Sequence, residues 1–144
     1  MPDVKALDVI RKARILEFLA APLAEKVAQA AQVRELPDGT TLMKAGDASD
    51  SLYVIVEGRV RVDVDFWGEG RKVAELGPGA IVGEVAALWG EARTATVTSL
   101  SPLVLLEVPG AIIREVAAAD PAFRKRLEEM INKHVDIDTG LAGG

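Results

Sequence analysis

The segment of this chain best suited to chemistry runs from Gly83 to Ala95. It opens with a glycine, continues as a short helical pattern from Glu84 to Trp89, and then reaches Arg93. Glycine lets the backbone approach a ligand closely, and the first turn of a helix carries unpaired N–H groups that favour an anion. An arginine offers two donors to a phosphate, whereas a carboxylate accepts hydrogen bonds from hydroxyl groups. The segment therefore predicts a site for a ligand with both a phosphate and a sugar hydroxyl.

The composition excludes most other kinds of site. The chain contains no cysteine, so thiol nucleophiles, iron–sulfur clusters and zinc–thiolate sites are ruled out. His134 is the only histidine, which excludes a multi-histidine metal site and leaves any catalytic triad dependent on one residue. The formal charge of −5 argues against a nucleic-acid partner. No apolar run is long enough to cross a membrane and the N-terminus lacks signal-peptide features, so we expect a cytoplasmic protein without membrane insertion.

Three zones of secondary structure are expected to position the segment. Residues 3–34 are predicted to form helices, with Pro22 as a break between two of them. Residues 36–108 are predicted to form short strands, of which five are clear: 52–56, 59–66, 72–76, 94–99 and 103–108. Residues 109–135 are predicted to form two helices, the second of them beginning at Asp120-Pro121, which pairs a capping residue with a helix-starting proline. The tail at 136–144 is expected to be disordered.

This order of elements predicts a mainly β member of the α+β class. Many short antiparallel strands with helices at both ends indicate an antiparallel β-roll or jelly roll. The short helix at 84–89 is then an insertion between two strands. A length of 144 residues suits one domain, which we place at residues 1–135.

The segment resembles the phosphate-binding cassette of cyclic-nucleotide-binding domains. That family has Phe-Gly-Glu, a small apolar helix, and then Arg followed by Ala, Ser or Thr and by Ala; this chain has Val82-Gly83-Glu84 and Arg93-Thr94-Ala95. Val82 and Ala92 stand where phenylalanine and proline are common, which affects packing and loop stiffness rather than ligand contacts. Five further motifs of the family recur in order: Leu36-Pro37-Asp38-Gly39, Ala45-Gly46-Asp47, Asp50-Ser51-Leu52-Tyr53, Val56-Glu57-Gly58 and Leu76-Gly77-Pro78-Gly79. Together they cover roughly residues 15–135.

The resemblance implies a role for each cassette residue. Arg93 would pair with the cyclic phosphate, and the backbone N–H groups of Ala86 and Thr94 would complete its cradle. Glu84 and the Gly83 backbone would hold the ribose 2′-hydroxyl. The Thr94 hydroxyl would reach the phosphate or the base. The full predicted ligand-binding set is Gly83, Glu84, Val85, Ala86, Arg93, Thr94 and Ala95.

The resemblance leaves the identity of the base open. A threonine after the arginine is often associated with cGMP, yet many bacterial members with serine or threonine there bind cAMP. We therefore expect cAMP, with cGMP as the alternative, and no cofactor or metal. No tryptophan or tyrosine follows Trp89, so we expect an aliphatic cap over the base. Its predicted members are Leu127, Met130, Ile131 and Val135.

The predicted function is a non-catalytic sensor that signals by moving its C-terminal helices. We expect an unidentified protein partner, a homodimer through the C-terminal helices, or a role as the regulatory domain of a longer channel or effector. Two alternatives stay open: an interaction scaffold of the same fold that ignores nucleotides, and a small-molecule enzyme on the same roll. A scaffold needs neither Glu84 nor Arg93, and the two residues taken alone could be only a surface ion pair of little energetic consequence.

Overall fold

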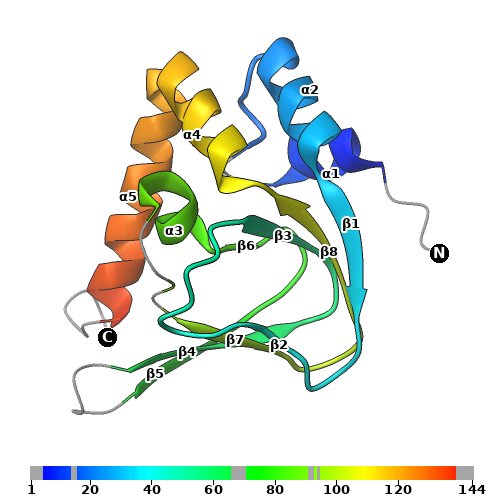
Figure 1. Cartoon of the computed structure of the whole chain (residues 1–144), viewed down its shortest axis with the longest axis vertical. Coiled ribbons are helices and arrows are strands. Elements are labelled where there is room, and N and C mark those ends of the chain that lie inside the picture. Colours follow the sequence, from blue (N-terminus) through cyan, green and yellow to red (C-terminus); the bar gives the residue numbers. More distant parts are fainter. Residues whose placement is uncertain (1–4, 14–15, 66–70, 91–92, 94, 139–144) are drawn as a thin grey trace.

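The described part of the chain is a β-roll with helices packed on one of its sheets (Figure 1). The computed structural model describes residues 5–13, 16–65, 71–90, 93 and 95–138. One sheet has the strand order β1-β8-β3-β6 and the other β2-β7-β4-β5, with every pair antiparallel. The strands are β1 (Gln32–Leu36), β2 (Thr41–Met43), β3 (Leu52–Glu57), β4 (Val60–Asp65), β5 (Arg71–Leu76), β6 (Ile81–Val82), β7 (Thr96–Ser99) and β8 (Leu103–Val108). This confirms the predicted fold class.

Strand β3 separates two apolar cores because its side chains alternate between the faces of its sheet. Leu52 and Val54 pack with the helices, in a cluster that includes Phe123 of the last helix. Tyr53 and Ile55 point the other way, into the interior of the roll between the two sheets. All four side chains are almost completely buried. The strand thus contributes at once to the helical core and to the roll interior.

The helices gather at one end of the roll. They are α1 (Ala6–Lys12), α2 (Ala21–Ala30), α3 (Glu84–Trp89), α4 (Gly110–Ala119) and α5 (Pro121–Asp138). The inserted helix α3 has the predicted bounds and packs against α4 and α5, as Figure 1 shows. The backbone N–H of Phe123 donates to the carboxylate of Asp120 at 3.1 Å, which confirms the predicted cap at the start of α5.

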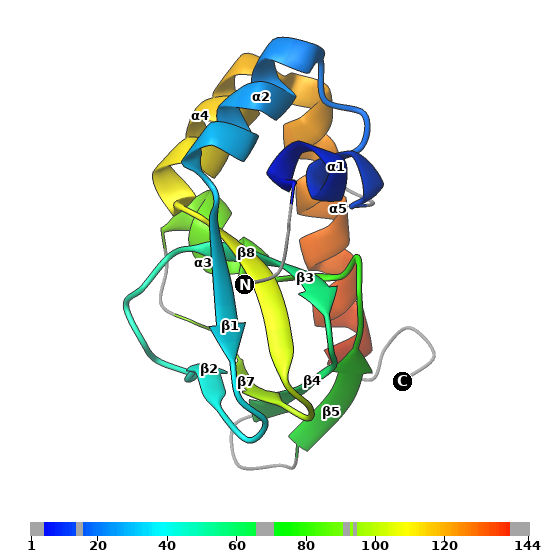
Figure 2. The same cartoon turned by 90° about the vertical axis from the view of Figure 1, so that its right-hand side faces the viewer.

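Two predicted boundaries were wrong. The helical zone does not extend to residue 34, because β1 begins at Gln32 and pairs along its whole length with β8 (Figure 2). The side chains of β1 are mostly exposed, so its sequence carries no alternating apolar signal, and its strand state depends on the hydrogen bonds of the ladder. Helix α5 continues to Asp138, beyond the predicted end at residue 135. The remaining tail, 139–144, lies outside the described residues.

The prediction that Pro22 is the break between two helices was wrong, because α1 ends at Lys12 and Pro22 lies within α2. Helix α2 begins at Ala21, so the proline lies in its first turn. The N–H groups of a first turn have no partner within the helix, and a residue without an N–H loses nothing there. Phe18 lies between the two helices and is 69% exposed.

Candidate functional site

Arg93 is held by its backbone against the loop that connects β2 and β3. Its N–H donates to the carbonyl of Asp47 at 2.8 Å, and its own carbonyl accepts from the N–H of Gly46 at 2.9 Å. The arginine side chain is only 4% exposed. A buried guanidinium is costly unless its donors and its charge are compensated. The surroundings of this group therefore define what the site can bind.

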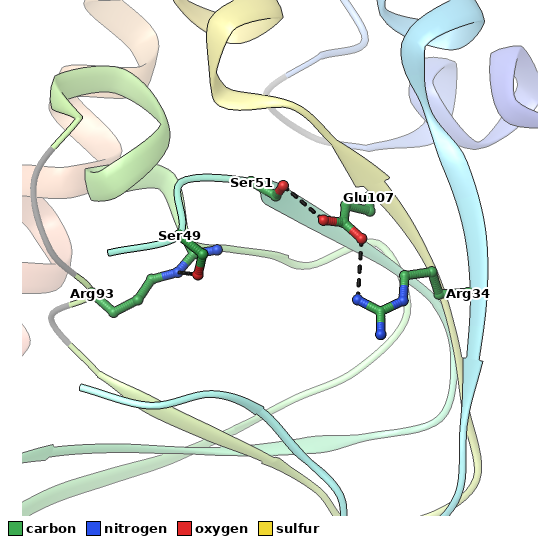
Figure 3. Close-up of polar contacts among 5 residues, drawn as sticks. All are labelled: Arg34, Ser49, Ser51, Arg93 and Glu107. Atoms are coloured by element: carbon green, nitrogen blue, oxygen red, sulfur yellow. Dashed lines mark hydrogen bonds and ion pairs between the residues drawn. The ribbon is translucent and has the colours of Figure 1, made fainter. Parts of the chain in front are cut away.

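The Arg93 guanidinium is only weakly satisfied within the described residues. Its Nε donates to Ser49 Oγ at 3.3 Å, as Figure 3 shows, and its Nη1 donates to the carbonyl of Gly83 at 3.4 Å; both bonds are long. The group lies over the ring of Tyr53, 5.5 Å from the ring centre. Its Nη2 is buried and finds no hydrogen-bond partner among the residues that the structure describes. An anionic acceptor would supply a hydrogen bond to Nη2 and place a negative charge beside the buried guanidinium.

Gly83 allows this close approach and could not be replaced without displacement of its neighbours. Its φ of +88° lies in the left-handed region, where it caps the start of α3. A Cβ atom at this position would lie 2.6 Å from Arg93 Nη1 and 2.7 Å from the carbonyl oxygen of Ser51. Gly83 and Arg93 are therefore in direct contact.

Glu84 follows directly as the first residue of α3 and is 8% exposed. Because both Glu84 and Arg93 are buried, they are not a solvated surface pair. Ala86 is also buried, whereas Val85 and Ala95 are half-buried. Thr94 lies outside the described residues. The structure thus brings Gly83, Glu84 and Arg93 together at the end of β6, beside the loop before β3.

The residues of the predicted base cap differ in their burial in the structure. Leu127 and Ile131 are fully buried within the helical core, and Met130 is partly buried against the same cluster. The side chain of Val135 lies outside the described residues. Leu127 and Ile131 therefore act as packing residues of α5 in this conformation, and their role over a base stays a prediction.

A second polar cluster lies beside the arginine and was missed at the sequence level. Ser51 Oγ donates to Glu107 Oε2 at 2.7 Å, and Arg34 Nη1 donates to Glu107 Oε1 at 3.1 Å (Figure 3). Glu107 is the cross-strand partner of Tyr53. The recurrence of Asp50-Ser51-Leu52-Tyr53 pointed to this region, but no local pattern links it to Arg34 or Glu107.

The pKa of the Tyr53 phenol depends on the charged groups around it. Burial raises the pKa of its phenol above the ordinary value of 10.0, and the neighbouring Glu107 carboxylate raises that pKa further. The positive charges of Arg93 and Arg34 act in the opposite direction. Tyr53 thus has the Arg93 guanidinium over its ring and Glu107 as its cross-strand neighbour.

The described residues hold no cluster of three or more histidine or acidic side chains placed to bind a metal ion. Within the same part of the chain, no helix has the length and apolar character needed to cross a membrane.

Comparison with known proteins identifies the family. The sequence profile described as "Cyclic nucleotide-binding domain" matches residues 33–120, which include the whole segment from Gly83 to Ala95. A cyclic nucleotide-gated potassium channel of Mesorhizobium japonicum is 29% identical over 127 residues. That match spans 83% of this chain and 34% of the channel, so the chain corresponds to about a third of that relative.

Solved structures agree with this assignment. The regulatory domain of Toxoplasma gondii PKA, crystallised with cAMP, is 27% identical with a TM-score of 0.70, and the match covers 92% of this chain and 49% of that one. The catabolite activator protein of Thermus thermophilus, at 23% identity and a TM-score of 0.70, shares the fold over 84% of this chain and 57% of its own. The resemblance seen in the cassette and the match over residues 33–120 lead to one conclusion: the chain belongs to the cyclic nucleotide-binding domain family.

Proposed function

We propose that the chain is a non-catalytic sensor that binds cAMP at Arg93, with cGMP as the alternative ligand. The observation that carries this proposal is the buried Nη2 of Arg93, which has no hydrogen-bond partner within the described residues. A cyclic phosphate carries one negative charge and two free oxygens. It can accept two parallel hydrogen bonds from the guanidinium while it neutralises the buried charge.

The remaining cassette residues would hold the rest of the nucleotide. Glu84 would accept a hydrogen bond from the ribose 2′-hydroxyl, next to the Gly83 backbone. The backbone N–H groups of Ala86 and Thr94 would complete the phosphate cradle, and Val85 and Ala95 would close the segment around it. The burial of Glu84 beside Gly83 supports this arrangement, because a water-excluded carboxylate binds a hydroxyl more strongly than an exposed one does.

Contacts of Arg114 would transmit a movement at the site to the C-terminal helices. Arg114 of α4 donates to the Ala87 carbonyl of α3 at 3.0 Å, and its Nη1 also lies 3.1 Å from the carboxylate of Asp50. A shift of α3 on nucleotide binding would therefore act on α4, and through it on α5. Leu127, Met130, Ile131 and Val135 would then cover the base. Conversion from a mostly open to a mostly closed population requires about 5.5 kcal/mol of differential binding.

The output would be a contact of these helices with a protein partner, a second copy of the chain, or another part of a longer channel or effector. The relative from Mesorhizobium japonicum is named as a gated channel, which supports the last of these as one form the output can take.

The test is calorimetric titration of the purified, nucleotide-free protein with cAMP and with cGMP. We expect binding of at least one of them, and a loss of about a hundredfold in affinity in Arg93→Ala. The matched control is Arg59→Ala, which removes an arginine on the surface, 3.6 Å from Glu75, where both side chains are more than half exposed. If the folded protein binds neither nucleotide at high micromolar concentration, the sensor function is contradicted and an interaction scaffold becomes the better account.

A further inference from the structure

Glu107 places a negative charge next to the proposed anion site. Tyr53 and Glu107 are directly opposite each other on neighbouring antiparallel strands, so their side chains lie on the same face of the sheet. The guanidinium of Arg93 lies over the ring of Tyr53, 5.5 Å from its centre. Tyr53 is only 4% exposed, and a buried ring screens nearby charges less than water does. An unpaired Glu107 would therefore repel a phosphate bound at Arg93.

Arg34 compensates that charge from outside the cassette. It lies on β1 opposite Leu105, and a residue in this position is a diagonal neighbour of Glu107 that a long side chain can reach. The Arg34–Glu107 contact is 3.1 Å, and Ser51 fixes the second carboxylate oxygen at 2.7 Å (Figure 3). The side chains of Arg34 and Glu107 are 42% and 24% exposed, so solvent reaches the arginine side of the pair and screens part of its interaction.

We propose that Arg34 determines the affinity of the site for a cyclic phosphate without contact with the ligand: by neutralising Glu107, it keeps the surroundings of Arg93 electropositive. That the ligand is a cyclic phosphate rests on the proposed function. The neutralisation of Glu107 by Arg34, which we call the charge balance, does not. Arg34 and Glu107 lie outside the segment from Gly83 to Ala95, and Glu107 contacts Ser51 and pairs with Tyr53, whose ring lies under Arg93. They are thus positioning residues of the site, acting through charge.

The test is a double-mutant cycle read by titration with cAMP: Arg34→Gln, Glu107→Gln and the two combined. Arg34→Gln should weaken binding about fivefold, and more strongly at low salt, because it exposes the charge of Glu107. Glu107→Gln should bind at least as tightly as the wild type, and the double variant should recover wild-type affinity. Arg59→Gln controls for the change in net charge. Unchanged affinity in Arg34→Gln, or a double variant as weak as Arg34→Gln, would overturn the inference.

A second readout needs no nucleotide. Tyr53 is the only tyrosine in the chain, so a fluorinated tyrosine incorporated biosynthetically reports this site alone in ¹⁹F NMR, and the fluorine substituent lowers the pKa into an accessible range. Arg34→Gln should raise the pKa of this phenol, and the double variant should bring it back. If the wild type binds no cyclic nucleotide, the proposed function fails while these pKa changes still support the charge balance. Unchanged pKa values in Arg34→Gln would overturn it even where the nucleotide binds.

Discussion

The carboxylate of Asp50 lies 3.1 Å from the guanidinium of Arg114, and this pair connects the loop before β3 to helix α4. Gly110 at the start of α4 also packs against that loop, since a Cβ atom there would be 2.6 Å from the Asp50 carbonyl oxygen. Asp50 stands between Ser49, which contacts Arg93, and Ser51, which contacts Glu107. Three successive residues thus contact the cradle arginine, helix α4 and strand β8.

The first prediction concerns Arg114. Replacement by glutamine removes a half-exposed ion pair and a hydrogen bond to the Ala87 carbonyl, and should lower the free energy of unfolding by about 1 kcal/mol. Denaturant unfolding measures this change. Asp50→Asn, which keeps the size of the side chain and leaves the Ala87 bond in place, should cost less. Equal losses in the two variants would mean that the carbonyl contact contributes nothing.

A second prediction separates two costs at Gly83. Gly83→Ala should destabilise the fold by about 1–3 kcal/mol from the positive φ, and should also weaken nucleotide binding, because its Cβ collides with Arg93 and Ser51. Gly39→Ala is the matched control: its φ is +77°, but a Cβ there meets nothing within 4 Å. Unfolding and titration should therefore show a stability loss in both variants and an affinity loss only in Gly83→Ala. An affinity loss of similar size in Gly39→Ala would contradict this explanation.

The alkaline stability of the protein should depend on Tyr53. Its pKa is raised in the folded state above the unfolded value of 10.0, so the unfolded chain loses this proton first as the pH rises. The stabilising contribution of the neutral phenol is therefore complete below pH 10.0 and is lost as the pH rises through the folded-state pKa. Tyr53→Phe should have a flatter profile in this window. Unfolding free energies measured on both sides of pH 10.0 give the comparison, and identical slopes would exclude this role.

The start of helix α5 gives a fourth prediction. Asp120→Ala removes the bond to the N–H of Phe123 and should cost about 1 kcal/mol of unfolding free energy. Asparagine caps helices about as well as aspartate, so Asp120→Asn should keep most of the stability. Thermal unfolding of both variants provides the measurement. A similar loss in the two would show that the negative charge, rather than the cap, stabilises this end.

Several elements were predictable because their patterns are local. The strands 59–66 and 72–76 were both predicted, and the structure pairs them as β4 and β5 with Val60 opposite Leu76. Helix α3 was marked by the glycine that opens it, and Gly83 has a positive φ. Strand β1 was not predictable in this way, since its side chains are mostly exposed and its partner is β8 at the other end of the chain.

Some residues of the candidate site could likewise be predicted from the sequence, and others could not. Gly83, Glu84 and Arg93 were found because they stand in one short segment with a recognisable order of residue types. Ser49 and Tyr53 were missed as neighbours of Arg93, and so was the Arg34–Glu107 pair. The Ser49–Arg93 and Arg34–Glu107 contacts join residues 44 and 73 positions apart, respectively, and only the closure of the roll brings them together.

The alternation of side chains along β3 constrains how its sequence can change in evolution, because the same strand serves the site and the helical core. Leu52 and Tyr53 are neighbours in sequence but face opposite compartments. Insertion or deletion of one residue in this strand would exchange the compartments, placing an aromatic ring among the helices and an aliphatic side chain under Arg93. We therefore expect β3 to tolerate substitutions that keep each side chain suited to the face it occupies. Insertions and deletions should be tolerated in the loops on either side of the strand, but not within it.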